Sequence, residues 1–171
     1  MIVSLLNHHI LWYFLTPQVI TFPGDGTQAV GMCGDPSRYP SHIKVLYDIA
    51  SQILKYDLLD LVMNGPAEKL KMTRYSQPAI FVSSLAALEN LRDRDPQAVE
   101  NCNSVAGFSL GEVAALVLAG VLNYEDAVEF VKYRAEAMQL AGEMVPSGMA
   151  VVFYGADSKL GKKLYNGILL P

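Results

Sequence analysis

At 171 residues the chain is long enough for one domain with a substantial core, and 51% of its residues are hydrophobic while only 18% are charged. A formal net charge of −4 without a Lys/Arg stripe gives no reason to expect a nucleic-acid partner. No apolar run reaches the ~20 residues that a membrane-spanning helix needs. Cys33 and Cys102 stand in no metal-ligand spacing, so we expect two reduced thiols of an intracellular protein and no metal site.

Residues 1–17 open the chain and are expected to lie outside the fold. This stretch is apolar but interrupted by Asn-His-His, and it lacks the basic start of a signal peptide and the arginines of a transit peptide. Val19 to Phe22 next predicts a buried strand, which ends at Pro23 to Gly26. The two glycines of that segment permit either a loop that exposes backbone N–H groups to a ligand or a simple turn.

Three helices are predicted over the following stretch. The first two, Ser41 to Leu54 and Leu58 to Met63, follow from apolar residues at helical spacing and from the stop signal Asn64-Gly65-Pro66. The third begins at Ser76-Gln77-Pro78, because a proline at the first helical position gives up no hydrogen bond, and it ends at Asp93 to Pro96. Its apolar stripe consists of Ile80, Phe81, Ser84, Leu85, Leu88 and Leu91.

The pentapeptide Gly107 to Gly111 is a G-x-S-x-G match between a strand-like run, Ser104 to Ala106, and a run of helix formers, Leu110 to Ala119. A strand that turns sharply into a helix forces the residue at the corner outward and requires small neighbours. Ser109 should therefore stand exposed at the positive end of a helix, where unpaired N–H groups favour a developing anion. A packing turn is the alternative to a nucleophile.

Asn123 predicts the N-cap of a further helix, with Asp126 beside its positive end. The apolar stripe of this helix is Val128, Val131, Ala135 and Met138. Pro146-Ser147-Gly148 ends the helix, and Met149 to Phe153 predicts another strand. Strands that alternate with helices indicate an α/β fold with a mainly parallel sheet.

Arg134 projects beside the apolar stripe of this last helix. A guanidinium in that position needs a fixed anionic partner, because burying it alone is prohibitive. One interpretation is a structural ion pair with Glu112 or Asp25. The other is a planar fork that receives the carboxylate of a ligand through two parallel charge-assisted hydrogen bonds.

Four segments carry a resemblance to a known family. Pro23 to Gln28 is similar to a P-G-Q-G-S-Q loop, Gln77-Pro78-Ala79 to a Q-P-A helix start, Gly107 to Glu112 to a G-H-S-L-G-E elbow, and Arg134-Ala135 with Met138 to an R-G/A-x-x-M helix. In this order they resemble the malonyl-CoA:acyl carrier protein transacylases of mitochondria and bacteria, and next the acyltransferase domains of polyketide synthases.

The resemblance spans Val19 to about Phe153 and implies an α/β-hydrolase-like acyltransferase core with a parallel sheet. It divides the chain into an extension at 1–17 that does not belong to the family, the N-terminal part of the acyltransferase domain at 18–148, and the start of a small ferredoxin-like subdomain at 149–171. We therefore expect an incomplete core, truncated where that subdomain begins.

The resemblance also implies a reaction. Ser109 would take the malonyl group from coenzyme A as an ester and pass it to the phosphopantetheine thiol of acyl carrier protein, in fatty-acid biosynthesis. Arg134 would pair with the malonyl carboxylate, Gln77 would help position the substrate, and the backbone N–H groups of Asp25 and Leu110 would form the oxyanion hole. No cofactor is implied, since malonyl-CoA is a substrate. The complete enzyme is expected to be a monomer in the mitochondrion, with the cytoplasm as the alternative.

Three departures from the family pattern are visible, and the second and third bear on activity. Phe108 replaces the usual histidine beside the serine, as in animal mitochondrial members. Asp25 replaces the loop glutamine, and its carboxylate would oppose a developing oxyanion by ~1–4 kcal/mol. No histidine follows Ser109 in this sequence, although a serine nucleophile needs a proton acceptor, and His42 in an early helix is a poor substitute. The chain as given is therefore expected to be weakly active or inactive.

Two alternatives stay open. A serine lipid hydrolase would share the elbow but would not need Arg134, since its pocket would prefer neutral acyl chains. A non-catalytic fragment that binds acyl-CoA or a carrier protein would retain the four segments without a proton acceptor.

Overall fold

The computed structural model describes residues 18–145, so the predicted strand at 149–153 and the segments 1–17 and 149–171 lie outside the described residues. The elements within the described range are β1 (Gln18–Phe22), η1 (Pro36–Arg38), α2 (Ser41–Leu54), α3 (Leu58–Asn64), α4 (Ala67–Leu70), α5 (Thr73–Arg94), α6 (Pro96–Glu100), β2 (Cys102–Gly107), α7 (Gly111–Leu118) and α8 (Tyr124–Met144).

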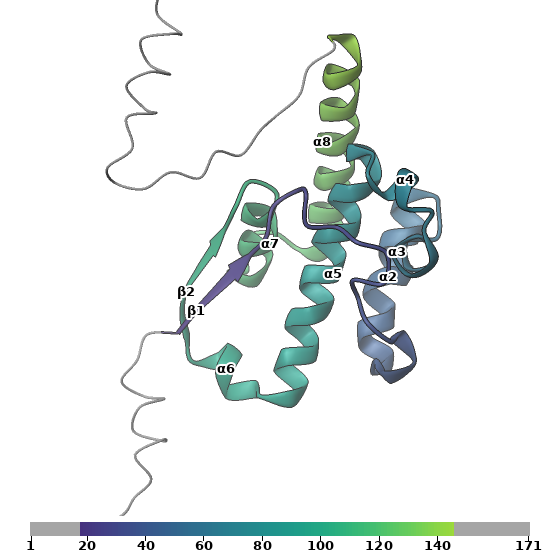
Figure 1. The fold of residues 1–171 in the computed structure, drawn as a ribbon. Helices are drawn as coiled ribbons and strands as arrows, with labels where there is room; N and C mark the ends of the chain where they lie inside the picture. The colour runs from purple at the N-terminus through teal and green to yellow at the C-terminus, as the bar shows by residue number, and fades with distance from the viewer. Residues whose placement is uncertain (1–17, 146–171) are drawn as a thin grey trace, which may run out of the picture.

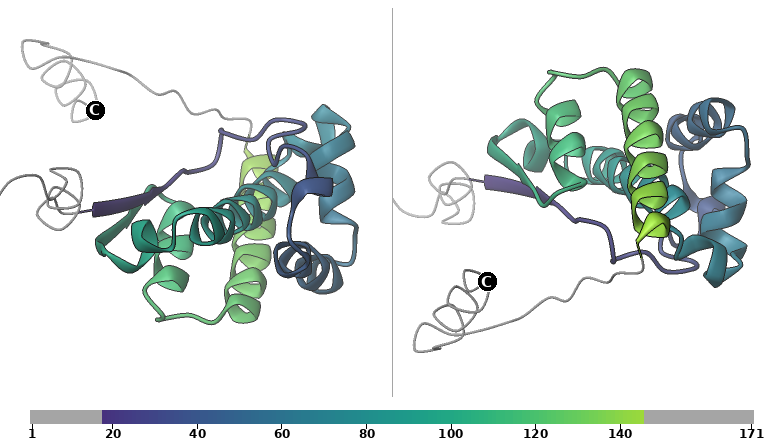
Figure 2. Two further views of the ribbon diagram at one scale, coloured as in Figure 1. Left: turned by 90° about the horizontal axis from the view of Figure 1, so that it is seen from below. Right: turned by 90° about the horizontal axis from the view of Figure 1, so that it is seen from above.

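The long helix α5 runs through the middle of the molecule (Figure 1). The strands β1 and β2 lie on one side of it with α6 and α7, whereas α2, α3 and α4 lie on the other side. Helix α8 crosses α5 and packs against it, as both views of Figure 2 show. The two strands are parallel, and their register pairs Phe22 with Gly107, so both strands end at the same edge. The predicted parallel α/β arrangement is confirmed.

Most predicted helices occur where the sequence places them. The helix at Ser41 to Leu54 is confirmed at both ends, and its fully buried residues are Ile43, Tyr47 and Ala50. Asn123 does cap α8, because its side chain accepts a hydrogen bond from the Asp126 N–H at 2.8 Å.

The predicted start of the third helix is wrong. Helix α5 begins at Thr73, so Pro78 lies inside the helix and not at its first position. The carbonyl of Met72 accepts hydrogen bonds from Tyr75 N–H at 2.8 Å and from Ser76 N–H at 2.9 Å, which starts the helix one turn earlier. The side chains of Ser76, Gln77 and Pro78 are therefore buried within a formed helix.

The first strand is less buried than its apolar sequence predicts. Of the residues in β1 only Phe22 is buried, and the Val19 side chain is 55% exposed. The described residues pair β1 with β2 alone and pack it against α7, and this leaves most of the strand at least partly exposed. The core lies instead where α2, α3, α5, α7 and α8 meet.

Burial in this core changes the chemistry of several side chains. Burial raises the pKa of the Tyr47 and Tyr124 phenols well above their ordinary value, and it raises the pKa of the Cys33 thiol. Tyr47 donates to Ser83 Oγ at 3.0 Å and Tyr124 donates to the Leu46 carbonyl at 2.7 Å, so both buried hydroxyls are satisfied. Cys33 is a free cysteine, as is Cys102.

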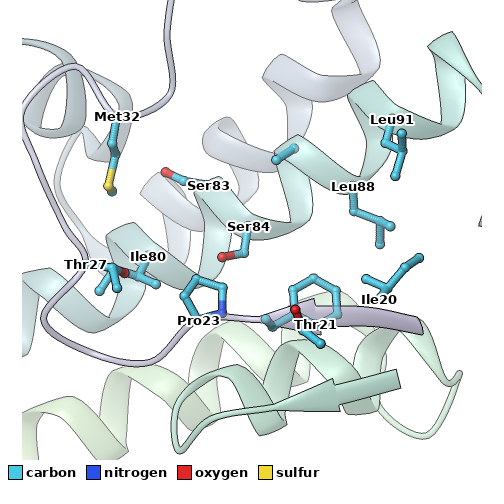
Figure 3. A pocket seen from close by; sticks show the side chains of 12 residues that line it. Ile20, Thr21, Pro23, Thr27, Met32, Ile80, Ser83, Ser84, Leu88 and Leu91 are labelled. Atoms are coloured by element: carbon cyan, nitrogen blue, oxygen red, sulfur yellow. The ribbon is translucent and has the colours of Figure 1, made fainter. Parts of the chain in front are cut away.

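An apolar hollow of about 430 Å³ opens between β1 and α5 (Figure 3). The side chains of Ile20 from β1 and of Ile80, Ser84 and Leu88 from α5 face it. It includes none of the side chains predicted to carry chemistry, so it is separate from the candidate site.

Candidate active site

The G-x-S-x-G segment forms a sharp turn between β2 and α7, as its sequence predicts. Ser109 has φ 55, in the left-handed region that non-glycine residues rarely occupy, and its side chain is exposed. Gly107 and Gly111 allow the turn because an added Cβ would lie 2.1 Å from the Gly111 carbonyl carbon and 2.3 Å from the Phe22 carbonyl oxygen, respectively. The two glycines therefore let β2, β1 and α7 meet at van der Waals distance, with the serine projecting from the corner.

Glu112 holds the turn from inside the helix. Its carboxylate accepts a hydrogen bond from the Ser109 N–H at 3.1 Å, which is the reciprocal half of an S-x-x-E capping box. The first turn of α7 closes through backbone bonds, including Glu112 N–H to the Ser109 carbonyl at 3.2 Å. Ser109 Oγ is therefore not used as a cap and remains available to another partner.

That partner is Arg134 from α8. Its Nη2 donates to Ser109 Oγ at 2.9 Å, and its Nη1 donates to the Gln77 side-chain carbonyl. Within residues 18–145 no carboxylate lies within ion-pair distance of Arg134, so the predicted structural ion pair with Glu112 or Asp25 is wrong. The guanidinium fork is instead held by two neutral oxygens at the mouth of the elbow.

Gln77 connects the fork to the loop after β1. Its side chain is 0% exposed, and its Nε2 donates to Met138 Sδ at 3.3 Å and to Asp25 Oδ2 at 3.5 Å. Asp25 also accepts from Ser76 Oγ at 2.7 Å. The carboxylate of Asp25 is thus directed towards the start of α5, while Met138, predicted as part of the apolar stripe, is 41% exposed and contacts Gln77.

The loop after β1 packs closely against the elbow. A Cβ on Gly24 would lie 2.8 Å from the Phe108 carbonyl oxygen and 2.6 Å from its ring, so only glycine fits there without displacement. Within residues 18–145 the backbone N–H groups of Asp25 and Leu110 have no acceptor. Two unpaired donors flank the serine turn, and their joint use as an oxyanion hole stays a prediction.

His42 does not reach this site. Its Nε2 lies 3.1 Å from the Asp93 carboxylate near the C-terminal end of α5. Asp93 follows Gln77 by sixteen residues on the same helix, which places it about 24 Å further along the axis. His42 is therefore too distant to take a proton from Ser109, and within residues 18–145 the only hydrogen-bond partner of Ser109 Oγ is Arg134.

Two further observations on the described residues concern metal ions and membranes. No group of three or more His, Cys, Asp or Glu side chains in residues 18–145 could hold a metal ion. None of the helices in that range is long and apolar enough to cross a membrane.

A hollow of about 480 Å³ borders the elbow where the two strands end, lined by Thr21, Phe22, Pro23, Ala106, Gly107 and Phe108.

The structure brings all five predicted site residues together. Hydrogen bonds join Asp25 to Gln77, Gln77 to Arg134, and Arg134 to Ser109. Leu110 is the next residue after Ser109. This arrangement presents an exposed hydroxyl, a cation and unpaired N–H donors at one point, which suits acyl transfer to the serine from a ligand with a carboxylate. Sequence reasoning missed Ser76 and the capping role of Glu112. The S-x-x-E spacing indicates the capping role of Glu112, whereas no local pattern indicates the contact of Ser76 with Asp25.

The chain is similar in sequence to a known protein family and to characterised proteins. The model of the acyl transferase domain family matches residues 19–162. A probable malonyl-CoA-acyl carrier protein transacylase, mitochondrial, from Drosophila melanogaster is 48% identical over 144 residues, and the match covers 84% of this chain and 38% of that protein. The mitochondrial malonyl-CoA-acyl carrier protein transacylase of Homo sapiens is 50% identical over 141 residues, which cover 82% of this chain and 36% of that protein.

Solved structures of the same class of protein also resemble this chain. A malonyl-transacylase in complex with its type II polyketide synthase acyl-carrier protein superposes with a TM-score of 0.68 at 35% identity, over 78% of this chain and 41% of that chain. This chain therefore spans about two fifths of the length of the proteins it matches.

Proposed function

The chain belongs to the acyl transferase domain family, and from that premise we propose that it carries the nucleophile and the carboxylate-binding side chains of a malonyl-CoA:acyl carrier protein transacylase. The observation that carries the proposal is the Arg134 guanidinium, which lies on Ser109 Oγ and is not neutralised by any carboxylate of the described residues. A cation beside a nucleophilic hydroxyl selects acyl groups with a free carboxylate, such as malonyl.

The proposed reaction has two steps with one covalent intermediate. Ser109 Oγ attacks the thioester carbon of malonyl-CoA, loses its proton to a general base, and the C–S bond breaks to release coenzyme A as its thiol. The phosphopantetheine thiol of acyl carrier protein then attacks the serine ester, which returns the proton to Ser109 and leaves a new thioester. The unpaired N–H groups of Asp25 and Leu110 would stabilise the oxyanion in both steps.

Within residues 18–145 Ser109 Oγ contacts no group that could serve as its proton acceptor. Loss of a general base typically costs 10²–10⁴-fold in rate. Residues 1–171 alone are therefore expected to acylate slowly, and a small external base should accelerate the step.

The test is acylation of Ser109. Incubation of residues 1–171 with malonyl-CoA, with and without imidazole, followed by peptide mass spectrometry, should show a malonyl ester on Ser109 that increases with imidazole. Ser109→Ala should show none. An adduct of equal yield in Ser109→Ala, or one that forms equally well from acetyl-CoA, would refute the proposal.

The contacts of Arg134 support this function over the alternatives from the sequence. A hydrolase for neutral acyl chains has no use for an unneutralised cation at the nucleophile, because the cation would be desolvated without a partner when such a substrate binds. A binding fragment without chemistry would predict malonyl-CoA binding with no ester on Ser109, which the same mass spectrum distinguishes.

We also propose a mitochondrial location, because the similar Drosophila and human proteins are both named as mitochondrial. Expression of the protein with a C-terminal tag, followed by organelle fractionation and protease protection, tests it. Recovery of the tagged protein in the cytosolic fraction alone would favour the cytoplasm.

A further inference from the structure

We propose that Asp25 is a positioning residue for the acyl carboxylate, because it fixes which end of the Gln77 side-chain amide faces Arg134. The inference rests on the proposed function of Arg134, and it concerns a residue at which this chain departs from the loop pattern that it otherwise resembles. The side chain of Asp25 does not touch the reacting atoms in this scheme and acts through Gln77, whereas its backbone N–H is the proposed oxyanion donor.

The contacts of the Asp25 carboxylate are all with donors. One oxygen accepts from Ser76 Oγ at 2.7 Å and from the Gly26 N–H at 3.0 Å, and the other accepts from Gln77 Nε2 at 3.5 Å. Ser76 is 1% exposed and Gln77 is 0% exposed, so this side of the carboxylate is shielded from water. The short bond to Ser76 anchors the carboxylate on α5, one residue from the amide that it orients.

The polarity of the two neighbours leaves Gln77 one orientation. An ionised carboxylate only accepts hydrogen bonds and a guanidinium only donates them, whereas a glutamine amide has one donating end and one accepting end. With Asp25 on one side and Arg134 on the other, the amide must present its NH₂ to Asp25 and its oxygen to Arg134. A flipped amide would place oxygen against oxygen and NH₂ against guanidinium, which is unfavourable at both ends.

This orientation determines where the fork of Arg134 points. The Gln77 oxygen holds Nη1, so Nη2 is left for Ser109 Oγ. If the amide could flip, the guanidinium would lose that neutral acceptor and its position beside the nucleophile. Asp25 therefore contributes to binding the acyl carboxylate even though its own charge has the same sign as that carboxylate.

The competing view, that the Asp25 charge repels the substrate, predicts an effect of the opposite sign. Asp25→Asn removes the charge and nearly preserves the shape, but an asparagine amide tolerates either orientation of Gln77. Positioning predicts that malonate binds about three- to tenfold more weakly to Asp25→Asn, the loss of one hydrogen bond. Repulsion predicts tighter binding, and the gain should fade at high salt.

The experiment measures malonate affinity by titration calorimetry on wild type, Asp25→Asn and Ser76→Ala at low and high salt. Ser76→Ala should weaken binding in the same direction, because it removes the anchor of the carboxylate. Asp35→Asn is the matched control, since it removes the same charge from an exposed loop carboxylate that contacts Ser37 and Arg38. Equal or tighter malonate binding by Asp25→Asn would overturn the inference.

A second readout needs no ligand. Side-chain amide proton exchange of Gln77, followed by NMR in the free protein, should be slow in wild type and faster in both Asp25→Asn and Ser76→Ala. Unchanged exchange would also overturn the inference. If wild type fails to bind malonate while the Gln77 protons stay protected by Asp25, the contact network stands and the proposed function of Arg134 is what fails.

Discussion

Arg134 Nη2 donates a hydrogen bond to Ser109 Oγ at 2.9 Å, although Arg134 lies in α8 and Ser109 in the turn before α7, 25 positions apart. The Arg134 guanidinium and the Ser109 hydroxyl are therefore in contact without a ligand. Because the fork is held by two neutral oxygens, a carboxylate would form a stronger hydrogen bond with it than either of them does, since donor and acceptor would then both be charged.

Arg134→Ala should reduce the use of malonyl-CoA about 10–100-fold, because a hydrogen bond between charged groups contributes roughly 1.5–3 kcal/mol. Acetyl-CoA offers no carboxylate and should be used as well as before. The measurement is the initial rate of Ser109 acylation with each substrate in the presence of imidazole. Lys132→Ala, two residues away on another face of α8, is the control and should change neither rate. Equal losses for both substrates would assign Arg134 a structural role.

Ser109→Gly should be more stable than Ser109→Ala by about 1–2 kcal/mol, since a side chain in the left-handed region carries that cost and glycine does not. Both variants remove the hydroxyl and its bond to Arg134, so the comparison isolates the backbone. Urea unfolding followed by circular dichroism measures the difference. Equal midpoints would show that the elbow stores no backbone strain.

Much of this site could be predicted from local sequence, and the remainder could not for a physical reason. The elbow and the Asn123 cap depend on residues within five positions of one another, and both are confirmed. Helix α6 also had a local signal, since Asp95 caps it and Pro96 starts it, but these residues were interpreted only as the end of α5. The predicted start of α5 is wrong because a proline is most common at the first position of a helix, whereas Pro78 lies inside this one.

The contacts that define the site join distant parts of the chain. Ser76 meets Asp25 across 51 positions, and Gln77 meets Arg134 across 57. Such pairs depend on how helices pack, which no periodicity encodes. The exposure of Val19 has the same origin, because an apolar strand is buried only where other elements cover it.

Gly107→Ala should lower the free energy of unfolding by about 1–3 kcal/mol or more, because the new methyl group would lie 2.1 Å from backbone of α7 that cannot easily move. Gly142→Ala is the matched control in α8, where an added Cβ meets nothing within 4 Å. It should raise stability by roughly 0.5–1 kcal/mol through helix propensity alone. Urea midpoints that move in the same direction for both variants would contradict the close packing at the elbow.

Stability should fall as the pH rises through about 10, the ordinary pKa of a tyrosine. Burial raises the pKa of Tyr47 and Tyr124, so the folded chain keeps phenolic protons that the unfolded chain releases. The unfolded state then binds fewer protons, and each such tyrosine removes up to about 1.4 kcal/mol per pH unit above its unfolded pKa. Below that pH the contribution is fully present.

Unfolding free energies between pH 8 and 11 test this dependence. Tyr47→Phe and Tyr124→Phe should each flatten the slope. The slope is the readout, because either core variant also loses a hydrogen bond at every pH. A slope unaffected by both core variants would show that other groups govern alkaline unfolding.

Because β1 pairs with β2, the elbow forms late in the folding of each new chain. Gln18 pairs with Cys102, 84 positions further on, and closing a loop of that length costs about 4 kcal/mol beyond a constant. During synthesis β1 stays unpaired until β2 has left the ribosome. Helices α2, α3 and α5 can already associate, because fewer residues separate them in the sequence. The turn that carries Ser109 and the loop that faces it therefore form together, and a kinetic trap that keeps the strands apart would yield a helical intermediate in which Ser109 and Asp25 are not brought together.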